Sequence, residues 1–380
     1  MLILEIIGGL LILVVLVVVH ELGHALVARR NGVVVEEFGI GFPPKAWAKK
    51  LKNGVLFSLN WLPVGGFVKL QGEQDAANKK GDYGAATLWQ KTKILFAGVV
   101  INWLVAVVLL TILAITGLPK IIPDQFSVAS DTKTVTSTLM LGTIVKDSPA
   151  EKAGFESGDR LYSVDGDSVT STADFIAATK AHSGEKVAIE YQSVGEDAIE
   201  KREVTLRDAS AGAVFGASLG QQEFIKATWS APVVGVVTTA QLTWVTLQGL
   251  GNLFANLATG VVLQFSSDDA TQKQAKENLA EVGDSVAGPV GILGTIFPEA
   301  ERAGLTQLVF LTAIISLTLA VMNTLPIPAL DGGRWFVTVL FRLIRKPLTK
   351  EIEERIQATG FIILMGLILL ITIGDVSKLL

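Results

Sequence analysis

Five consecutive residues, His20, Glu21, Leu22, Gly23 and His24, combine residue types and a spacing that could bind a metal ion and activate a water molecule. On a helix, residues four apart lie one turn apart on the same face, so both imidazoles can reach one metal ion. Zinc suits two neutral imidazole nitrogens, and a catalytic zinc keeps one position open for water. Glu21 is placed to accept a proton from that water. The pattern therefore predicts a zinc site with Glu21 as the general base.

Two of the three histidines in the chain fall within this motif, and the third is His182. A chance match to a short pattern is the alternative interpretation. The motif, however, ends the apolar run Leu2–Val19, in which Glu5 is the single charged residue. Charged side chains at membrane depth cost roughly 2.5–3.5 kcal/mol each on insertion scales. Metal binding would offset such a cost, so the sequence favours a functional site.

The composition is typical of a membrane protein. Of 380 residues, 50% are hydrophobic and 18% are charged, whereas soluble proteins have about 25% charged residues. Intrinsic disorder and a collagen-like chain are excluded by the same composition. The chain has no cysteine, which excludes disulfides, thiolate catalysis and metal sites with cysteine ligands.

Four apolar runs are long enough to cross a membrane, which takes about 20 residues. The runs are Leu2–Val19, Ile94–Leu118, Leu305–Leu330 and the one that begins near Ile356 and ends at Ile373. The charges between them predict their orientation. Because basic loops stay in the cytoplasm, a basic segment between two runs marks the cytoplasmic side.

Residues 29–93 hold 11 Lys and Arg against 5 Asp and Glu, and residues 334–355 hold 6 against 3. Residues 118–305 are acidic, with 14 basic and 24 acidic side chains. We therefore expect the long acidic segment, and the N-terminus with it, on the outer side of the membrane.

The segment Phe224–Gln264 has no charge after Lys226 and could be a fifth crossing. It is rich in Thr, Gln, Asn and Gly, unlike the other apolar runs. One extra crossing would also place Asp331 on the opposite side of the membrane from His20. The favoured interpretation is an amphipathic helix, or a pair of helices, at the outer surface.

A catalytic zinc needs a third protein ligand, and elimination favours Asp331. His182 lies within the acidic outer segment, and Glu5 and Asp375 fall at the outer ends of their spans. Asp331 follows the third apolar run on the cytoplasmic side, where the first run also ends. Two prolines before it break the helix and free backbone groups. A plain helix end with a capping Asp is the alternative.

The H-E-L-G-H motif in the first span, followed late in the chain by N-x-x-P-x-P-x-L-D-G-G, resembles the site-2 protease family of intramembrane zinc metalloproteases. The closer resemblance is to its bacterial regulator-of-sigma-E protease branch, and it covers nearly the whole chain. It implies one Zn²⁺ per chain, held by His20, His24 and Asp331. It also implies that Glu21 is the catalytic base and that Asn323 helps to hold the substrate backbone.

Two segments, Phe38–Pro43 and Pro63–Leu70, resemble the membrane-re-entrant β-hairpin that follows the first span in this family. The residues themselves have strand character, interrupted by Gly and Pro. An unwound substrate could pair with such a strand by strand addition. The predicted substrate contacts are Gly65, Gly66 and Phe67.

In the second span, Ala97–Asn102 matches the family pattern A-G-P-x-x-N only in part, because Val99 replaces the proline. The departure puts a local kink in doubt and leaves the zinc site unaffected. For Asn102 itself, a bond between helices is the plain interpretation.

Residues 126–208 resemble a bacterial PDZ domain. The pattern predicts a short helix after Ser148, a hairpin turn at Asp165-Gly166, and a second helix over Asp174–Ala181. PDZ grooves bind extended peptides by strand addition, and backbone N–H groups near Gly142 are predicted to receive a terminal carboxylate. A purely steric role, the exclusion of folded ectodomains, is an equal alternative.

The sequence thus predicts a polytopic α-helical membrane protein with four transmembrane helices, a membrane-associated β-hairpin and one extracytoplasmic α+β PDZ domain. The predicted segments are 1–30 (first span), 31–92 (hairpin and loop on the cytoplasmic side), 93–118 (second span), 126–208 (PDZ domain), 209–304 (outer amphipathic helical region), 305–331 (third span), 332–355 (cytoplasmic link) and 356–375 (fourth span).

The predicted function is an intramembrane zinc endopeptidase of the bacterial cytoplasmic (inner) membrane. Its expected partners are the lipid bilayer and single-span membrane proteins already shortened by another protease, such as anti-sigma factors or remnant signal peptides. No nucleic-acid partner is expected. The alternatives are a non-enzymatic PDZ scaffold with a structural metal site and a zinc transporter. A structural zinc normally has four protein ligands, whereas the sequence offers three candidates. A transporter needs metal-binding residues along a path through the membrane, whereas the sequence has a single cluster of them.

Overall fold

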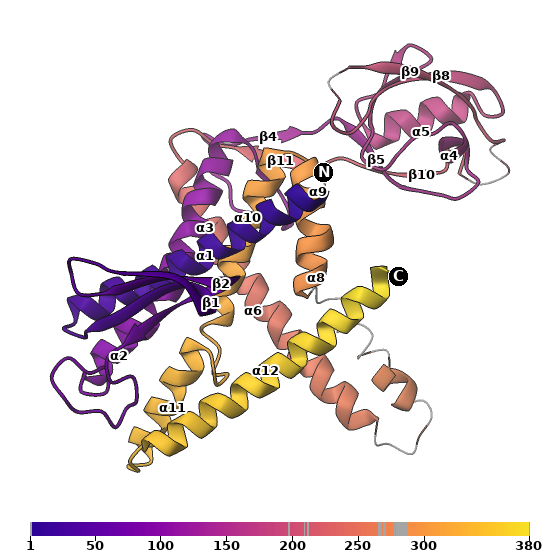
Figure 1. Cartoon of the computed structure of the whole chain (residues 1–380). Coiled ribbons are helices and arrows are strands. Elements are labelled where there is room, and N and C mark those ends of the chain that lie inside the picture. Colours follow the sequence, from indigo (N-terminus) through magenta and orange to yellow (C-terminus); the bar gives the residue numbers. More distant parts are fainter. Residues whose placement is uncertain are drawn as a thin grey trace. The chain divides into compact units, whose positions relative to one another are not determined.

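The computed structural model divides into two compact units (Figure 1). The first comprises Met1–Leu110, Gly235–Glu301 and Leu308–Leu380, and the second comprises Thr111–Val234 and Arg302–Gln307. The residues that the structure describes are 2–196, 198–208, 210, 213–264, 268, 271–276, 278 and 288–379. Part of the region predicted as amphipathic helix, 209–304, therefore lies outside the described residues.

Long apolar helices build the first unit and join it to the second. In chain order, the helices outside the PDZ-like region include α1 (Leu2–Arg30), α2 (Leu88–Leu95), α3 (Ala97–Thr116), α6 (Ala231–Leu263), α8 (Pro289–Gly291), α9 (Phe297–Arg302), α10 (Leu305–Met322), α11 (Asp331–Leu343) and α12 (Lys350–Leu379). A π-helical turn, Ile292–Ile296, joins α8 to α9.

Among the described residues, five helical segments are long and apolar enough to cross a membrane. Four of them coincide with the predicted spans: α1, α2 with α3, α10 and α12. The fifth is α6, a continuous helix of 33 residues in the segment for which the sequence favoured a surface helix or helix pair. By length and composition the number of candidate spans is therefore five, whereas the sequence predicted four.

The contacts of α9 show where the chain lies before α10 begins. They therefore bear on the expectation that a crossing by α6 would place Asp331 and His20 on opposite sides of the membrane. The ring of Phe297 in α9 fills the space beside Gly9, in the first third of α1. The chain has therefore reached the N-terminal end of α1 before α10 begins. Because Asp331 contacts His20 after α10 has ended, α10 runs in the same direction as α1. The two motifs meet whether or not α6 enters the membrane.

The third span is shorter than predicted. Helix α10 ends at Met322, residues 323–330 are not helical, and Asp331 begins the separate helix α11. Pro326 and Pro328 lack the backbone N–H that a continuing helix would need. The predicted cytoplasmic link, 332–355, is therefore largely the helix α11 and the beginning of α12.

Strands β1 (Val35–Lys50) and β2 (Leu56–Leu70) form the predicted hairpin and pack against α1. Each long strand bends, so that Phe38 pairs with both Phe57 and Val68. The first half of β1 therefore lies between the two halves of β2. This arrangement leaves residues 66–70 at an edge of the small sheet, on the side of α1.

The second unit holds a PDZ-like domain. Its sheet has the order β10-β5-β6-β8-β9, with β7 paired to β6. The strands are β5 (Leu139–Ile144), β6 (Arg160–Val164), β7 (Asp167–Ser168), β8 (Lys186–Gln192), β9 (Glu200–Thr205) and β10 (Ala217–Gly220), and the helices are α4 (Pro149–Lys152) and α5 (Thr172–Ala181). A second sheet in this unit has the order β3-β11-β4 and consists of β3 (Leu118–Pro119), β11 (Glu223–Lys226) and β4 (Lys133–Thr136).

Local sequence explains most of the PDZ-like domain. Asp165 and Gly166 both have positive φ, as a two-residue hairpin turn requires. Ser148 and Ser171 cap the two helices with their side chains. Strand β10 lies beyond the predicted end of the domain at Asp208, and it completes the sheet by pairing with β5.

Candidate metal centre

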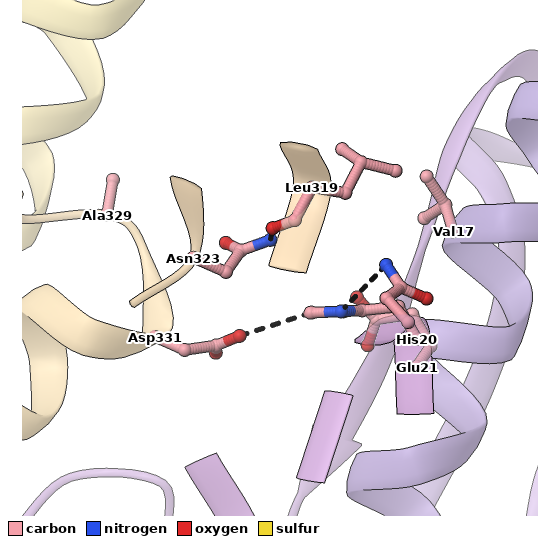
Figure 2. Close-up of a pocket in the computed structure, with 8 residues that line it drawn as sticks. Val17, His20, Glu21, Leu319, Asn323, Ala329 and Asp331 are labelled. Carbon is pink, nitrogen blue, oxygen red and sulfur yellow. Dashed lines mark hydrogen bonds and ion pairs between the residues drawn. The ribbon is translucent and has the colours of Figure 1, made fainter. Parts of the chain in front are cut away.

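Three side chains from two distant segments converge in the first unit. The Nε2 atoms of His20 and His24 lie 3.1 Å apart, and Oδ2 of Asp331 lies 3.1 Å from the first and 3.3 Å from the second. Both histidines are buried. Figure 2 shows His20 and Glu21 on α1 facing Asp331, which approaches from the segment after α10. The structure thus brings together the three predicted metal ligands.

The two histidines sit where α1 and α3 lie in close contact. A Cβ added to Gly98 would lie 2.5 Å from Cε1 of His20 and 2.6 Å from Nε2 of His24. A Cβ on Gly23 would lie 2.8 Å from the carbonyl oxygen of Ala97. Both glycines are therefore needed for the close approach of the two backbones. The Nδ1 of His24 donates to the carbonyl of Ile94 at 2.8 Å, which orients its Nε2 toward Asp331.

Asp331 is held by the non-helical segment that precedes it. The N–H of Gly332 donates to the carbonyl of Asn323 at 2.8 Å and closes the segment into a loop. A Cβ on Gly333 would overlap the carbonyl of Ile327, so the beginning of α11 lies directly on this loop. Ala329 has a φ of 79°, a left-handed conformation that costs a non-glycine residue about 1–3 kcal/mol. Such a conformation persists only where neighbouring contacts enforce it.

A group of charged and aromatic side chains anchors α11 just after Asp331. The Nε of Arg334 lies 3.4 Å from Oε1 of Glu353, and its guanidinium lies 4.7 Å from the centre of the Tyr83 ring. The other carboxylate oxygen of Glu353 accepts from the N–H of Asp75 at 2.7 Å. Burial raises the pKa of the Tyr83 hydroxyl, so this ring stays neutral beside the cation. The group joins α11 to α12 and to the loop before α2.

A cavity of about 200 Å³ opens beside His20 and Asp331. Its lining includes His20, Glu21 and Asp331, together with Asn323 and Asn102. A water molecule and a peptide carbonyl could therefore lie next to both the metal ligands and the Glu21 carboxylate. In Figure 2 the amide of Asn323 is bonded to the carbonyl of Leu319, at 3.0 Å, at the border of the cavity.

The predicted substrate contacts of the hairpin lie in β2. A Cβ on Gly66 would be 3.7 Å from Cγ of Glu21, which places the edge of β2 beside the Glu21 side chain. Gly65 has a φ of 89°, and the Phe67 ring stacks on Phe42 with a centroid distance of 6.4 Å. The structure brings Gly66 to the site, whereas Phe67 packs within the hairpin.

Gly142 occupies a different environment from the one expected. It lies in β5, which pairs with β10 on one side and β6 on the other. A Cβ on Gly142 would meet the Ser218 hydroxyl of β10, so this glycine permits the close pairing of two strands. Strand addition needs a free edge, and β5 is an inner strand. A peptide that adds as a strand would therefore not do so at β5, and the carboxylate contact near Gly142 stays a prediction.

Sequence reasoning missed two contributors to the site, Gly98 and Asn102. Both belong to the Ala97–Asn102 segment, which was treated as an imperfect match to a family pattern. The signal was their spacing of four residues, which puts them on one face of α3. The segment could not be linked to His20 without knowing that α3 packs on the end of α1.

This fold and site define a membrane-embedded metallopeptidase, and the comparison with protein families agrees. The family model described as "Peptidase family M50" matches residues 8–367, so the chain belongs to peptidase family M50. It is a zinc metalloprotease of that family.

Among its relatives, a protein from Clostridium perfringens named as a candidate zinc metalloprotease is 32% identical over 371 residues, covering 98% of both chains. The regulator of sigma-W protease RasP of Bacillus subtilis is 25% identical over 459 residues, covering 98% of both chains. The PDZ domain of an SdrC-like protein from Listeria monocytogenes aligns with 25% of this chain and 93% of its own, at 22% identity and a TM-score of 0.19.

The donor set fits the zinc ion that the family implies. Two imidazole nitrogens and one carboxylate oxygen, each from one residue, lie within 4.8 Å of one another. Neutral imidazole and carboxylate are common zinc ligands, and three protein ligands are typical of catalytic sites with an open fourth position. The adjoining cavity provides space at that position.

Proposed function

We propose that this protein is an intramembrane endopeptidase that cuts the membrane-spanning segments of single-span proteins, in the manner of regulated intramembrane proteolysis. One observation carries the proposal. Two of the three ligand side chains, His20 and Asp331, line one cavity together with Glu21, and His24 lies against both of them. The helices that supply His20, Glu21 and the loop of Asp331 are long and apolar enough to span a bilayer. A peptide bond that reaches this cavity would be cut at membrane depth.

The residues have separate roles in this reaction. A zinc ion held by His20, His24 and Asp331 would supply a Lewis acid and lower the pKa of a bound water to about 7. Glu21 accepts the proton of the attacking water and passes it to the nitrogen of the leaving amine. The amide of Asn323, at the cavity border, would hold the substrate backbone beside the reacting carbonyl.

The substrate must be extended where it is cut, because a helical peptide bond has its carbonyl engaged in a hydrogen bond. The edge of β2 offers the backbone groups that an unwound segment needs. Gly66 lies beside Glu21 and presents no side chain to the substrate. We propose that the substrate adds as a strand next to Gly66 and so brings its scissile bond to Glu21. Phe67 stiffens the hairpin by stacking on Phe42.

The PDZ-like domain would act upstream of the cut, as a peptide receptor or as a size filter for substrates shortened by another protease. The sheet ends at β10 and β9, so a peptide that extends this sheet would have to add at one of these strands and not at β5. This makes β10, beside β5, the strand to examine for peptide binding.

We further propose that the PDZ-like domain lies outside a bacterial cytoplasmic membrane, since the segment that contains it is acidic and the loops that flank the site are basic. The absence of cysteine makes single-cysteine labelling clean. In intact cells, an impermeant maleimide is expected to label Lys152→Cys, in α4, and to leave Lys346→Cys, after α11, unlabelled until lysis. The opposite labelling pattern would contradict this orientation.

Removal of the metal tests the proposed reaction. Purified protein in detergent should cut a single-span substrate, lose this activity on chelation, and regain it when about one Zn²⁺ per chain is restored. Mg²⁺ is the control ion and should not restore activity, since it prefers oxygen ligands. A protein that holds zinc but cuts none of a panel of truncated substrates would favour the non-enzymatic scaffold instead.

A further inference from the structure

Asn102 is a buried polar side chain that faces Nδ1 of His20, the ring nitrogen turned away from the other metal ligands. It is fully buried in α3 and lines the cavity. Its Nδ2 lies 3.4 Å from Nδ1 of His20, and its Oδ1 is buried without a hydrogen-bond partner. An unpaired buried amide oxygen is unfavourable, so its position next to the site requires an explanation.

The chemistry of His20 supplies one. Its Nε2 points to Asp331 and to His24, so Nε2 is the atom available to a metal. A neutral imidazole that uses Nε2 as a ligand carries its proton on Nδ1, and this N–H needs an acceptor. For His24 the acceptor is the carbonyl of Ile94. For His20 the facing group is the amide of Asn102.

The two ends of an asparagine amide have nearly the same shape and exchange places by a half turn of the side chain. With Oδ1 toward His20, the orphaned oxygen accepts the Nδ1–H. We propose that Asn102 is a positioning residue of the metal site. Its side-chain oxygen accepts the Nδ1–H of His20, fixes the tautomer with a free Nε2, and sets the plane of the ring.

The backbone of Asn102 is itself held in place. Its carbonyl accepts a hydrogen bond of 2.9 Å from the hydroxyl of Ser316 in α10, and Ser316 is also fully buried. Helix α10 leads directly into the loop that carries Asp331. Through its side chain Asn102 contacts His20 in α1, and through its carbonyl it is bonded to Ser316 in α10. It therefore helps to hold α1, which carries the histidines, in a fixed position relative to α10, which leads to Asp331.

Three variants of the full chain test this role. Asn102→Leu keeps the volume but removes the acceptor, and Asn102→Asp keeps an acceptor oxygen. Thr239→Val is the matched control, because it removes a buried side-chain hydrogen bond, from Thr239 to the carbonyl of Gly235 in α6, at a residue that does not line the cavity. We expect Asn102→Leu to bind zinc about 10–100-fold more weakly in chelator competition, the range for lost partners of metal ligands. Asn102→Asp and Thr239→Val should bind zinc within about threefold of the wild-type affinity.

The tautomer of His20 gives a second readout that does not depend on activity. With ¹⁵N-labelled histidine the chain contributes only three side chains, His20, His24 and His182. In the zinc-loaded wild type, His20 should be protonated at Nδ1 alone, and Asn102→Leu should weaken that preference. Unchanged zinc affinity in Asn102→Leu would overturn the proposal, and so would a raised KM without any change in zinc binding, which would indicate contact with substrate. If Asn102→Leu does not fold, Asn102→Ser and Asn102→Asp test the acceptor role instead, since both keep a side-chain oxygen. Weak zinc binding by both variants would contradict the role.

Discussion

Glu21→Gln is expected to lower kcat for cleavage of a single-span substrate by about 10²–10⁴-fold, the usual contribution of a general base. Glutamine has the same shape as glutamate but cannot accept a proton at neutral pH. Glu21 lines the cavity with His20 and Asp331 and is not one of the three ligand side chains. The variant should therefore keep its zinc. Cleavage rate and zinc content, measured on the same sample, test both parts of the expectation.

The matched control for this variant is Glu36→Gln, an exposed residue in the basic stretch after α1 whose carboxylate pairs with Lys69 on the surface. An exposed ion pair is worth about 0–1 kcal/mol, so this control should cut at the wild-type rate. Loss of zinc together with activity in Glu21→Gln would mean that Glu21 supports the metal rather than the proton transfer.

Gly98→Ala is expected to disrupt the metal site without removing any ligand. The new methyl group would come within 2.5–2.7 Å of ring atoms of both His20 and His24. Either the rings or the α1 and α3 backbones must then move. Because metal sites depend on ligand positions held to about 0.5 Å, we expect zinc affinity to fall by roughly 10–100-fold, with a parallel loss of cleavage at limiting zinc.

Gly366→Ala in α12 is the control for the change of glycine to alanine, because a Cβ there meets no atom within 4 Å. Alanine is the better helix former by about 1 kcal/mol, so this variant should be as stable as the wild type and bind zinc normally. Wild-type zinc affinity in Gly98→Ala would show that the two helices approach less closely than the structure has them.

The metal site could be predicted from the sequence to a large extent because its chemistry is local. The i, i+4 spacing of His20 and His24 defines a shared helical face. Asp331 could be identified because few acidic residues lie near a membrane boundary and because two prolines and two glycines mark its segment. The convergence of these three side chains confirms that the two motifs meet in space.

The remaining features depend on packing between segments far apart in the sequence. The role of Gly98 becomes visible only when α3 lies on α1, and that of Asn102 only when its side chain faces His20. The surroundings of Gly142 depend on such packing as well. Strand β10 follows it by some 75 residues and pairs with β5. Hydropathy alone also did not determine whether α6 crosses the membrane or lies at its surface. Its Thr, Gln and Asn residues are compatible with a helix of spanning length.

The most direct test of an intramembrane zinc protease is to map the bond that it cuts. The full chain would be reconstituted in lipid vesicles with a single-span substrate whose outer part has been shortened, and the products would be identified by mass spectrometry. We predict one principal cut within the apolar span of the substrate, and no such product with Glu21→Gln. A cut outside the span, or the same product from the Glu21→Gln protein, would contradict the account.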